Sequence, residues 1–298
     1  MDRIHVMQLV RAFQVGELSR REFLKRTTLA LGSLAAANTL LVACTQFPNE
    51  SAPPVVDESQ PAATPGQATE GELISGVVEY PDSDGETLMG HLAYQANGGP
   101  VPGIVVIQEW WGLNDHIKDV TNRFAQEGFV ALAPDLYHGV ATTEPDEARK
   151  LVMELDFEEA VKEIGQAMQF LTAQDYVSGE KVGVVGFCMG GGLALQTALA
   201  LEDTGAGVIF YGSPLDTDEA RQMRAPILSF IGTEDNIPVS EVEKMHNVFS
   251  ETGLKNEFHV YEGAKHAFFN DTRPEAYNAA AATDAWPRAL AWFRENLG

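Results

Sequence analysis

The feature that most constrains the fold is a short apolar run that ends in a glycine-rich turn. Lys181–Phe187 reads as a buried strand, and Gly190–Leu201 reads as a helix. A strand, a sharp turn and a helix in this order hold Cys188 in strained backbone, where neighbours without a Cβ avoid clashes. The pattern Gly186-x-Cys188-x-Gly190 is that of a nucleophile elbow with cysteine in place of serine. We therefore predict that Cys188 is a nucleophile, with a small buried cysteine as the simpler alternative.

Strands and helices alternate along the rest of the chain. The predicted strands occupy residues 76–80, 88–94, 103–108, 129–133, 181–187, 206–211, 226–231 and 256–261. The predicted helices occupy residues 116–127, 144–172 with a break near Asp156, 190–201, 239–252 and 274–296. The first two strands read as an antiparallel pair. The later alternation favours an α/β fold with a mostly parallel central sheet and helices on both faces, in which functional residues follow the carboxyl ends of strands.

A nucleophile needs a base and a group that orients the base. Asp235 and His266 each follow a predicted strand, so both fall at the same sheet edge as the cysteine. We prefer Asp235 over Glu234 because it directly precedes the segment that turns into a helix. His246 lies within a predicted helix and His259 within a predicted strand, so neither is placed for catalysis. The order nucleophile, acid, histidine favours Asp235 and His266.

Glu109 follows another buried strand and precedes two tryptophans, Trp110 and Trp111. A carboxylate in this setting is poorly suited to the surface, so we predict that it controls the proton of Cys188. A salt-bridged or edge-exposed glutamate is the alternative. The N-terminus of the helix that follows Cys188 favours a thiolate, and the Met189 N–H group points toward a developing oxyanion.

Five segments in order carry a resemblance to a known family. They are Val106–Asn114 (VIQEWWGLN), Ala133–Tyr137 (APDLY), Gly186–Gly191 (GFCMGG), Gly232–Asp235 (GTED) and His266–Asn270 (HAFFN). With them, residues 73–298 resemble the dienelactone hydrolase family, which has the α/β-hydrolase fold.

The resemblance implies specific roles for the residues at these positions. It implies a catalytic triad of Cys188, Asp235 and His266, and it implies that the carboxylate of Glu109 pairs with the thiol in the resting state. The implied oxyanion donors are the backbone N–H groups of Met189 and Trp110. It further implies that substrate binding leads the glutamate to accept the thiol proton. The thiolate then opens a lactone or ester to a thioester, which water activated by the histidine hydrolyses.

The chain departs from the family where the family holds a substrate carboxylate with two arginines. Asn270 stands at one of these positions, and Pro145 and Asp146 occupy the stretch of the other. Asparagine does not replace a bidentate guanidinium, and a chain with a net charge of −23 disfavours anionic substrates. We therefore expect the substrate to be a neutral or less acidic lactone or ester. Arg149 and Arg273 are left as possible substitutes. The substrate-binding residues that we predict are Trp111, Tyr137, Arg149, Phe268 and Asn270.

The first 44 residues read as an export signal. Ser19–Lys25 resembles a twin-arginine signal, and the uncharged apolar stretch 27–43 suits a signal core. Cys44 ends a sequence that resembles a bacterial lipobox, whose cysteine is lipidated. Residues 45–72, rich in Pro, Ser and Thr, are expected to form a flexible tether. We therefore expect an extracytoplasmic protein held to a membrane by lipid on Cys44. An uncleaved anchor helix and an amphipathic N-terminal helix of the fold are the alternatives.

Composition narrows the choice of partners. The acidic balance disfavours nucleic acid. No Glu/His spacing suits zinc and no phosphate loop is visible, so we expect no metal and no cofactor. Each of the two cysteines is explained by its own motif, so we expect no disulfide. We expect a small-molecule lactone or ester as substrate, and we favour a monomer. Two alternative functions remain: a carboxylesterase or thioesterase of this fold, and a non-catalytic lipoprotein that binds a ligand.

Overall fold

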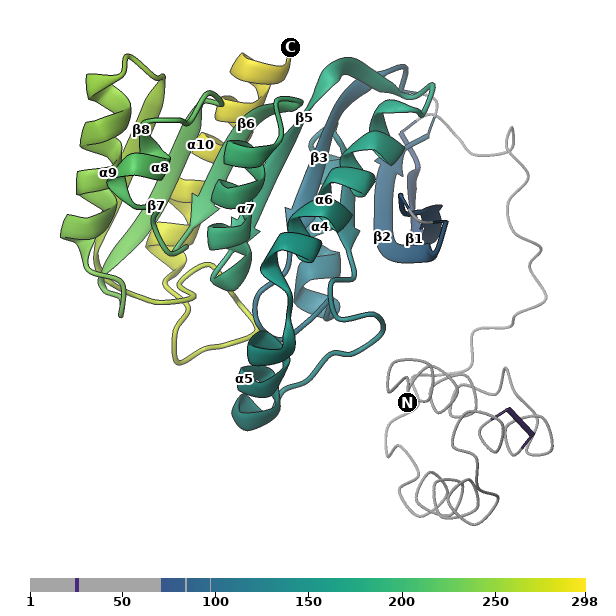
Figure 1. The fold of residues 1–298 in the computed structure, drawn as a ribbon, viewed down its shortest axis with the longest axis horizontal. Helices are drawn as coiled ribbons and strands as arrows, with labels where there is room; N and C mark the ends of the chain where they lie inside the picture. Colours follow the sequence, from purple (N-terminus) through teal and green to yellow (C-terminus); the bar gives the residue numbers. More distant parts are fainter. Residues whose placement is uncertain (1–24, 27–70, 84, 97) are drawn as a thin grey trace. The chain divides into compact units, whose positions relative to one another are not determined.

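The computed structural model describes residues 25–26, 71–83, 85–96 and 98–298 (Figure 1). Residues Ala68–Gly298 form one compact unit. The predicted twin arginines, the lipidation site Cys44 and nearly all of the tether lie outside the described residues. Within the described part of the chain, no helix combines the length and the apolar character needed to cross a membrane.

An eight-stranded sheet forms the centre of the fold (Figure 1). Neighbouring strands follow the order β1-β2-β4-β3-β5-β6-β7-β8. The β1–β2 and β2–β4 pairs are antiparallel, and all pairs from β4 to β8 are parallel. This is the mostly parallel sheet that the alternation of strands and helices predicts. The strands are β1 (Leu73–Pro81), β2 (Thr87–Gln95), β3 (Val101–Ile107), β4 (Val130–Pro134), β5 (Val177–Phe187), β6 (Thr204–Phe210), β7 (Ile227–Glu234) and β8 (Asn256–Lys265).

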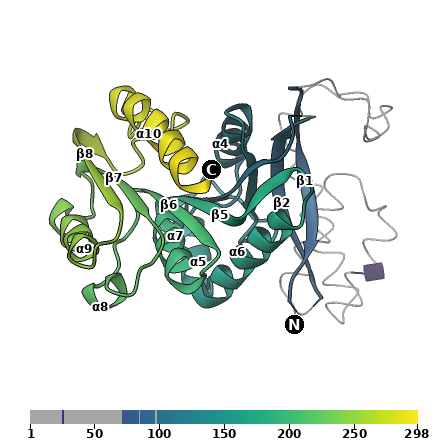
Figure 2. The same cartoon turned by 90° about the horizontal axis from the view of Figure 1, so that it is seen from above.

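Helices cover both faces of this sheet (Figure 2). The longer ones are α4 (Asp115–Gln126), α5 (Pro145–Glu154), α6 (Phe157–Thr172), α7 (Met189–Ala200), α9 (Val239–Glu251) and α10 (Ala279–Leu297), and α8 (Thr217–Ala220) is a single turn. Helices α4 and α10 lie on one face, and α6, α7 and α9 lie on the other. The predicted break near Asp156 is confirmed, because its carboxylate accepts hydrogen bonds from the backbone of Glu158 and Glu159 and caps α6.

One predicted helix start is wrong and one helical turn was not predicted, and side-chain capping explains both. Helix α10 begins at Ala279 rather than at residue 274, because the Asn278 side chain accepts a hydrogen bond from the backbone N–H of Ala281 at 3.1 Å. The turn α8 was not predicted, and a capping box between Asp216 and Glu219 forms it. The late start of α10 leaves residues 274–278 in a loop beside the candidate site.

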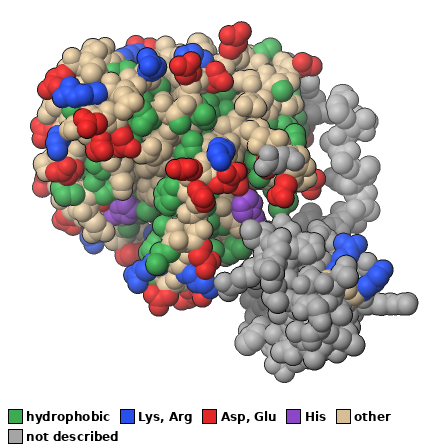
Figure 3. Space-filling view, in the orientation of Figure 1, with side chains coloured by type: hydrophobic (Ala, Val, Ile, Leu, Met, Phe, Trp, Pro, Cys, Tyr) green, Lys and Arg blue, Asp and Glu red, His purple; other side chains and the backbone are tan. Residues whose placement is uncertain are grey.

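The core below the carboxyl edge of the sheet is aromatic. The ring centroid of Phe210 lies 4.8 Å from those of Phe187, Phe230 and Phe269. All four side chains are at least 98% buried, so they form a rigid base for the residues that follow β5, β6, β7 and β8. Acidic side chains are spread over the face of the molecule that Figure 3 shows.

Candidate active site

Cys188 stands at the turn between β5 and α7, at the point where the sequence predicts a nucleophile elbow. Its backbone has φ 57° and ψ −119°, a left-handed conformation that costs about 1–3 kcal/mol for a residue with a Cβ. A Cβ on Gly186 would overlap the backbone of Gly190, and one on Gly190 would overlap the carbonyl oxygens of Ile107 and Gln108. The turn therefore closes only with glycine at both positions. It leaves the thiol free and partly exposed at the N-terminus of α7.

Asp235 and His266 come together at the neighbouring strand ends. Strand β7 runs to Glu234 and β8 runs to Lys265, so each residue follows its strand directly. The His266 Nδ1 atom lies 2.9 Å from Oδ1 and 3.0 Å from Oδ2 of Asp235. The Asp235 side chain is fully buried, and Oδ1 also accepts the backbone N–H of Ile237 at 2.9 Å. This bond fixes the carboxylate where the chain turns toward α9.

The protonation of His266 is set by its neighbours. Burial alone lowers the pKa of this imidazole, but hydrogen bonds with Asp235 and Cys188 and the negative charges of both groups outweigh burial and raise the pKa to about 10. His266 is therefore protonated at neutral pH and lies in hydrogen-bond contact with the Cys188 side chain. The arrangement can therefore hold an imidazolium beside the thiolate that forms when Cys188 loses its proton.

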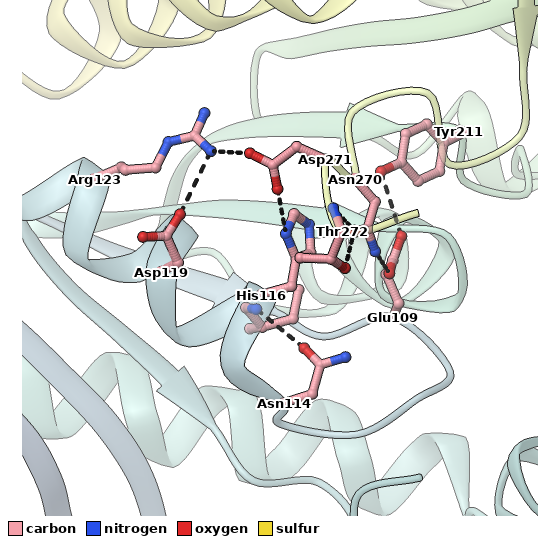
Figure 4. A network of polar contacts seen from close by, with 10 residues as sticks. Glu109, Asn114, His116, Asp119, Arg123, Tyr211, Asn270, Asp271 and Thr272 are labelled. Atoms are coloured by element: carbon pink, nitrogen blue, oxygen red, sulfur yellow. Dashed lines mark hydrogen bonds and ion pairs between the residues drawn. The ribbon is translucent and has the colours of Figure 1, made fainter. Parts of the chain in front are cut away.

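Glu109 is a fourth ionisable group at this edge, two residues after β3 ends at Ile107. Its side chain is buried, with Oε2 accepting from Asn270 Nδ2 at 2.6 Å and Oε1 accepting from the Tyr211 hydroxyl at 3.4 Å (Figure 4). Burial raises the pKa of Glu109, and the hydrogen bond from Asn270 and the charges of His266 and Arg273 oppose that rise. A carboxyl group held between these opposing effects can accept and return a proton.

These groups open into one cavity of about 390 Å³. Cys188, His266 and Glu109 line it together with both tryptophans. The other lining residues are Asn236, Ala267, Arg273, Glu275 and Ala276. The cavity is large enough for a small organic ester and brings three groups able to exchange a proton to its wall.

Arg273 supplies the guanidinium at this wall. It stacks 4.3 Å from the centroid of the Trp111 ring, and its Nε donates to Glu275 Oε1 at 3.0 Å. The tryptophan fixes the guanidinium plane, while the glutamate offsets its charge. The loop that carries Arg273 is also fastened to α4, because the Asp271 carboxylate lies 3.5 Å from His116 and 3.7 Å from Arg123 (Figure 4).

The comparisons with known proteins agree with this architecture. The family model described as "Dienelactone hydrolase family" matches residues 88–297. The chain belongs to the dienelactone hydrolase family. It is therefore a hydrolase of the dienelactone hydrolase type, which acts on carboxylic esters.

Relatives of the dienelactone hydrolase family align over nearly the whole described unit. "Protein usf" of Aquifex pyrophilus is 37% identical over 231 residues, which cover 74% of this chain and 98% of that protein. "Putative carboxymethylenebutenolidase" of Methylorubrum extorquens is 34% identical over 241 residues, covering 75% of this chain and 81% of that protein. A solved dienelactone hydrolase-like promiscuous phosphotriesterase from metagenomic libraries superposes with a TM-score of 0.69 at 26% identity, over 76% of this chain and all of that one.

The predicted substrate-binding residues fall into two groups. Trp111 lines the cavity. Arg149 is two-thirds exposed on α5, pairs with Asp146 at 3.7 Å and is not among the lining residues. Phe268 is fully buried in the aromatic core, so it supports the site from below rather than facing it.

Tyr137 and Asn270 are also not among the residues that line the cavity. The Tyr137 hydroxyl contacts the Met189 sulfur at 3.3 Å, and Asn270 is buried against Glu109. Of the predicted oxyanion donors, Trp110 lines the cavity, and Met189 is the first residue of α7 but is not among the lining residues.

The sequence analysis missed Tyr211, Glu275 and Asn236. Tyr211 is fully buried with φ 42°, and its ring packs 5.1 Å from that of His266 while its hydroxyl donates to Glu109. Its place after the buried run of β6 and before Gly212 is a signal that the sequence offers. Glu275 and Asn236 reach the cavity through loop conformations that no local pattern indicates.

Among the described residues, no group of three His, Cys, Asp or Glu side chains could hold a metal ion.

Proposed function

We propose that this protein hydrolyses a small, uncharged carboxylic ester or lactone with Cys188 as nucleophile, His266 as acid and base, and Asp235 as the group that orients the histidine. The observation that carries the proposal is the convergence of Cys188, His266 and Glu109 on one cavity, with Asp235 hydrogen-bonded behind the histidine. Each group follows a different parallel strand, and the sheet places all four at one edge.

Acylation begins with the proton of the thiol. On substrate binding, Glu109 accepts this proton: the S–H bond breaks, an O–H bond forms, and a thiolate remains at Cys188. The thiolate attacks the carbonyl carbon, and the backbone N–H groups of Met189 and Trp110 stabilise the oxyanion. The C–O bond to the alcohol then breaks, and the alkoxide takes a proton from protonated His266. In a lactone, this alcohol stays attached to the acyl chain.

Deacylation uses the histidine in the opposite sense. Neutral His266 accepts a proton from water as its oxygen attacks the thioester carbon. The C–S bond breaks and releases a carboxylic acid and the cysteine sulfur, to which Glu109 returns its proton. Asp235 stabilises the imidazolium in both half-reactions through its contact with Nδ1. Atoms balance as ester plus water giving acid plus alcohol.

The cavity favours an uncharged substrate. Two tryptophans and two alanines supply the apolar part of its wall, and Glu275 offsets the charge of Arg273 there. The strongly acidic body, at a net charge of −23 for the whole chain, slows the approach of anions. The relatives named for carboxymethylenebutenolidase and phosphotriesterase activity support hydrolysis of esters at a site of this kind.

Hydrolysis by the full chain with a matched pair of cysteine variants tests this function. The substrates are p-nitrophenyl acetate and butyrate, a simple lactone, a carboxylated dienelactone and its methyl ester. Cys188→Ala should abolish turnover of every substrate, and Cys188→Ser should retain a trace of it. A folded native protein that hydrolyses none of them would favour the ligand-binding alternative. Faster turnover of the carboxylated dienelactone than of its methyl ester would contradict the uncharged substrate.

We further propose that the chain is exported through the twin-arginine route and anchored by lipid on Cys44. The motifs of residues 19–44 support this, together with the tether that follows them. Labelling with radioactive palmitate in a bacterial host should mark the native protein in the membrane fraction. Cys44→Ala should remove the label, and replacing both arginines of the signal with lysine should keep the protein in the cytoplasm. Label that persists in Cys44→Ala would refute the anchor.

A further inference from the structure

The side-chain amide of Asn270 is held at both ends (Figure 4). Its Oδ1 accepts the hydroxyl of Thr272 at 2.7 Å and the backbone N–H of Thr272 at 3.1 Å. Its Nδ2 donates to Glu109 Oε2 at 2.6 Å. Turning the amide over would break the bonds to Thr272 and set two oxygens against each other. The nitrogen must therefore face Glu109.

This geometry makes Asn270 a donor that cannot titrate. A neutral amide N–H next to a carboxylate stabilises its ionised form and offers it no proton. Glu109 is 99% buried, and burial without such a donor would favour the protonated form. The Tyr211 hydroxyl is the second donor, at a longer 3.4 Å. Asn270 therefore provides the shorter of the two hydrogen bonds that favour the ionised form of this carboxylate.

The other groups that act on Glu109 come from several elements. Protonated His266 and Arg273 lie on the loop after β8 and favour the carboxylate. The titratable and charged groups that face it around the cavity are His266, Arg273, Tyr211, Cys188 and Glu275. None of them makes a hydrogen bond to Glu109 as short as the one from Asn270 among the described residues.

We propose that Asn270, oriented by Thr272, is a positioning residue that keeps Glu109 ionised and fixed at the cavity, ready to accept the Cys188 proton whatever the charge of the substrate. The inference rests on the proposed function, because the proton it concerns is the one released in acylation. It deepens that function, since a site primed by its own amide needs no anionic substrate group to activate it. An uncharged ester is then a full substrate.

Three variants separate this role from a structural one. Asn270→Leu removes the donor, and Asn270→Asp places a second carboxyl group beside Glu109. Thr272→Val removes the hydroxyl that orients the amide, and Thr272 is exposed, so its packing changes little. Asn278→Asp is the control: it adds the same charge on the same loop, at a cap where aspartate serves as well as asparagine.

The first readout is the pH profile of kcat/KM for p-nitrophenyl acetate, whose acid limb reports the essential base of the free enzyme. We expect the acid limb to move to higher pH by about one unit in Asn270→Leu, because the ionised carboxylate loses its donor. Asn270→Asp should move it further, since two carboxyl groups share one proton. Thr272→Val should move it in the same direction by less, and Asn278→Asp should leave it in place. In the native protein, the limb should coincide for a neutral ester and its carboxylated analogue.

The second readout does not depend on turnover. The infrared C=O band of protonated Glu109, assigned by subtracting Glu109→Gln, should titrate over the same pH ranges as the acid limbs. Unchanged limbs and an unchanged band in Asn270→Asp and Thr272→Val would overturn the proposal, even if Asn270→Leu failed to fold. If hydrolysis proved independent of Cys188 the proposed function would fail, and the infrared titration would still decide whether Asn270 controls Glu109.

Discussion

The imidazole of His266 meets the carboxylate of Asp235 through Nδ1, at 2.9 and 3.0 Å from the two carboxylate oxygens. Nδ1 must carry a proton to donate to this acceptor, so Nε2 is left to face the cysteine. The buried carboxylate thus fixes both the orientation and the tautomer of the ring. This contact joins residues 31 positions apart in the chain.

Asp235→Asn should therefore lower kcat for ester hydrolysis by roughly a thousandfold or more, a loss similar to that in other triads whose acid becomes an amide. The amide stabilises an imidazolium poorly and allows the wrong tautomer. The pKa of His266, which the charge of Asp235 helps to raise, should fall in the variant. NMR titration of the imidazole and steady-state kinetics measure the two effects.

Glu234→Gln is the matched control for this prediction. Glu234 is the neighbouring acid, exposed at the last position of β7, and it was the competing candidate in the sequence. Its replacement should change kcat by less than twofold. Equal losses in both variants would mean that net charge at this edge matters, rather than the contact with His266.

A second prediction concerns charge at the cavity wall. Glu275→Gln should raise the rate on a carboxylated ester relative to its methyl ester, because it frees the Arg273 guanidinium from its partner at 3.0 Å. An exposed pair of this kind is worth up to about 1 kcal/mol, which limits the change to about two- to fivefold. The effect should shrink at high salt.

Arg273→Gln provides the opposite arm of that experiment. It should lower the rate on the carboxylated ester more than the rate on the methyl ester, because it removes the guanidinium that a substrate carboxylate can contact. The ratio of kcat/KM values for the two substrates measures both variants. A ratio that moves in the same direction in both would show that the loop shape, and not its charge, sets the preference.

The elements that carry the site were predictable because each has a local cause. Cys188 sits between glycines on a strand-to-helix turn, and Asp235 and His266 follow apolar runs, so chain-local patterns locate all three. The parallel sheet then brings them together, since carboxyl ends of neighbouring parallel strands share an edge. The break near Asp156 was also predicted from the sequence, and the structure shows that the Asp156 side chain caps the second helix.

The rest of the site depends on contacts between distant segments. Asn270 reads as a substrate contact from its place near the histidine, yet it is bonded to Glu109, 161 positions earlier in the chain. Arg149 looked like an available guanidinium, but its helix directs it to solvent. Such roles are set by how loops cross above the sheet edge, which neither periodicity nor turn chemistry determines.

A third prediction tests the tight turn. Gly190→Ala should prevent folding or lower stability by about 3 kcal/mol or more, since the added methyl overlaps the backbone at the end of β3. Gly192→Ala, two residues along α7, is the control, because its Cβ would meet nothing closer than 3.8 Å. That variant should be neutral or up to about 1 kcal/mol more stable. Urea unfolding measures both, and equal stability of the two variants would contradict the packing of the elbow.

The last prediction follows from a buried histidine away from the site. His246 Nε2 lies 2.8 Å from Ser229 Oγ, and Nδ1 lies 2.9 Å from Asn256 Oδ1. The side chain is closed off from solvent at 5% exposure, so this serine, histidine and asparagine set links α9 to β7 and β8 rather than reacting with substrate. Burial lowers the pKa of His246 to about 4.

The sign of the resulting pH dependence is set by the unfolded chain, where histidine titrates near 6.5. Below that pH His246 binds a proton in the unfolded state but stays neutral in the folded state. The free energy of unfolding therefore falls as the pH drops from 6.5 to about 4, by up to about 3 kcal/mol. His246→Gln keeps polar contacts without titrating and should flatten this part of the profile. His259→Gln, on β8 with its side chain partly exposed, should leave it unchanged. Urea unfolding at pH 4.5, 5.5 and 6.5 measures this dependence. If the free energy of unfolding of His246→Gln fell as steeply with pH as that of the native protein, the acid sensitivity would belong to the other buried histidines, His91 and His116.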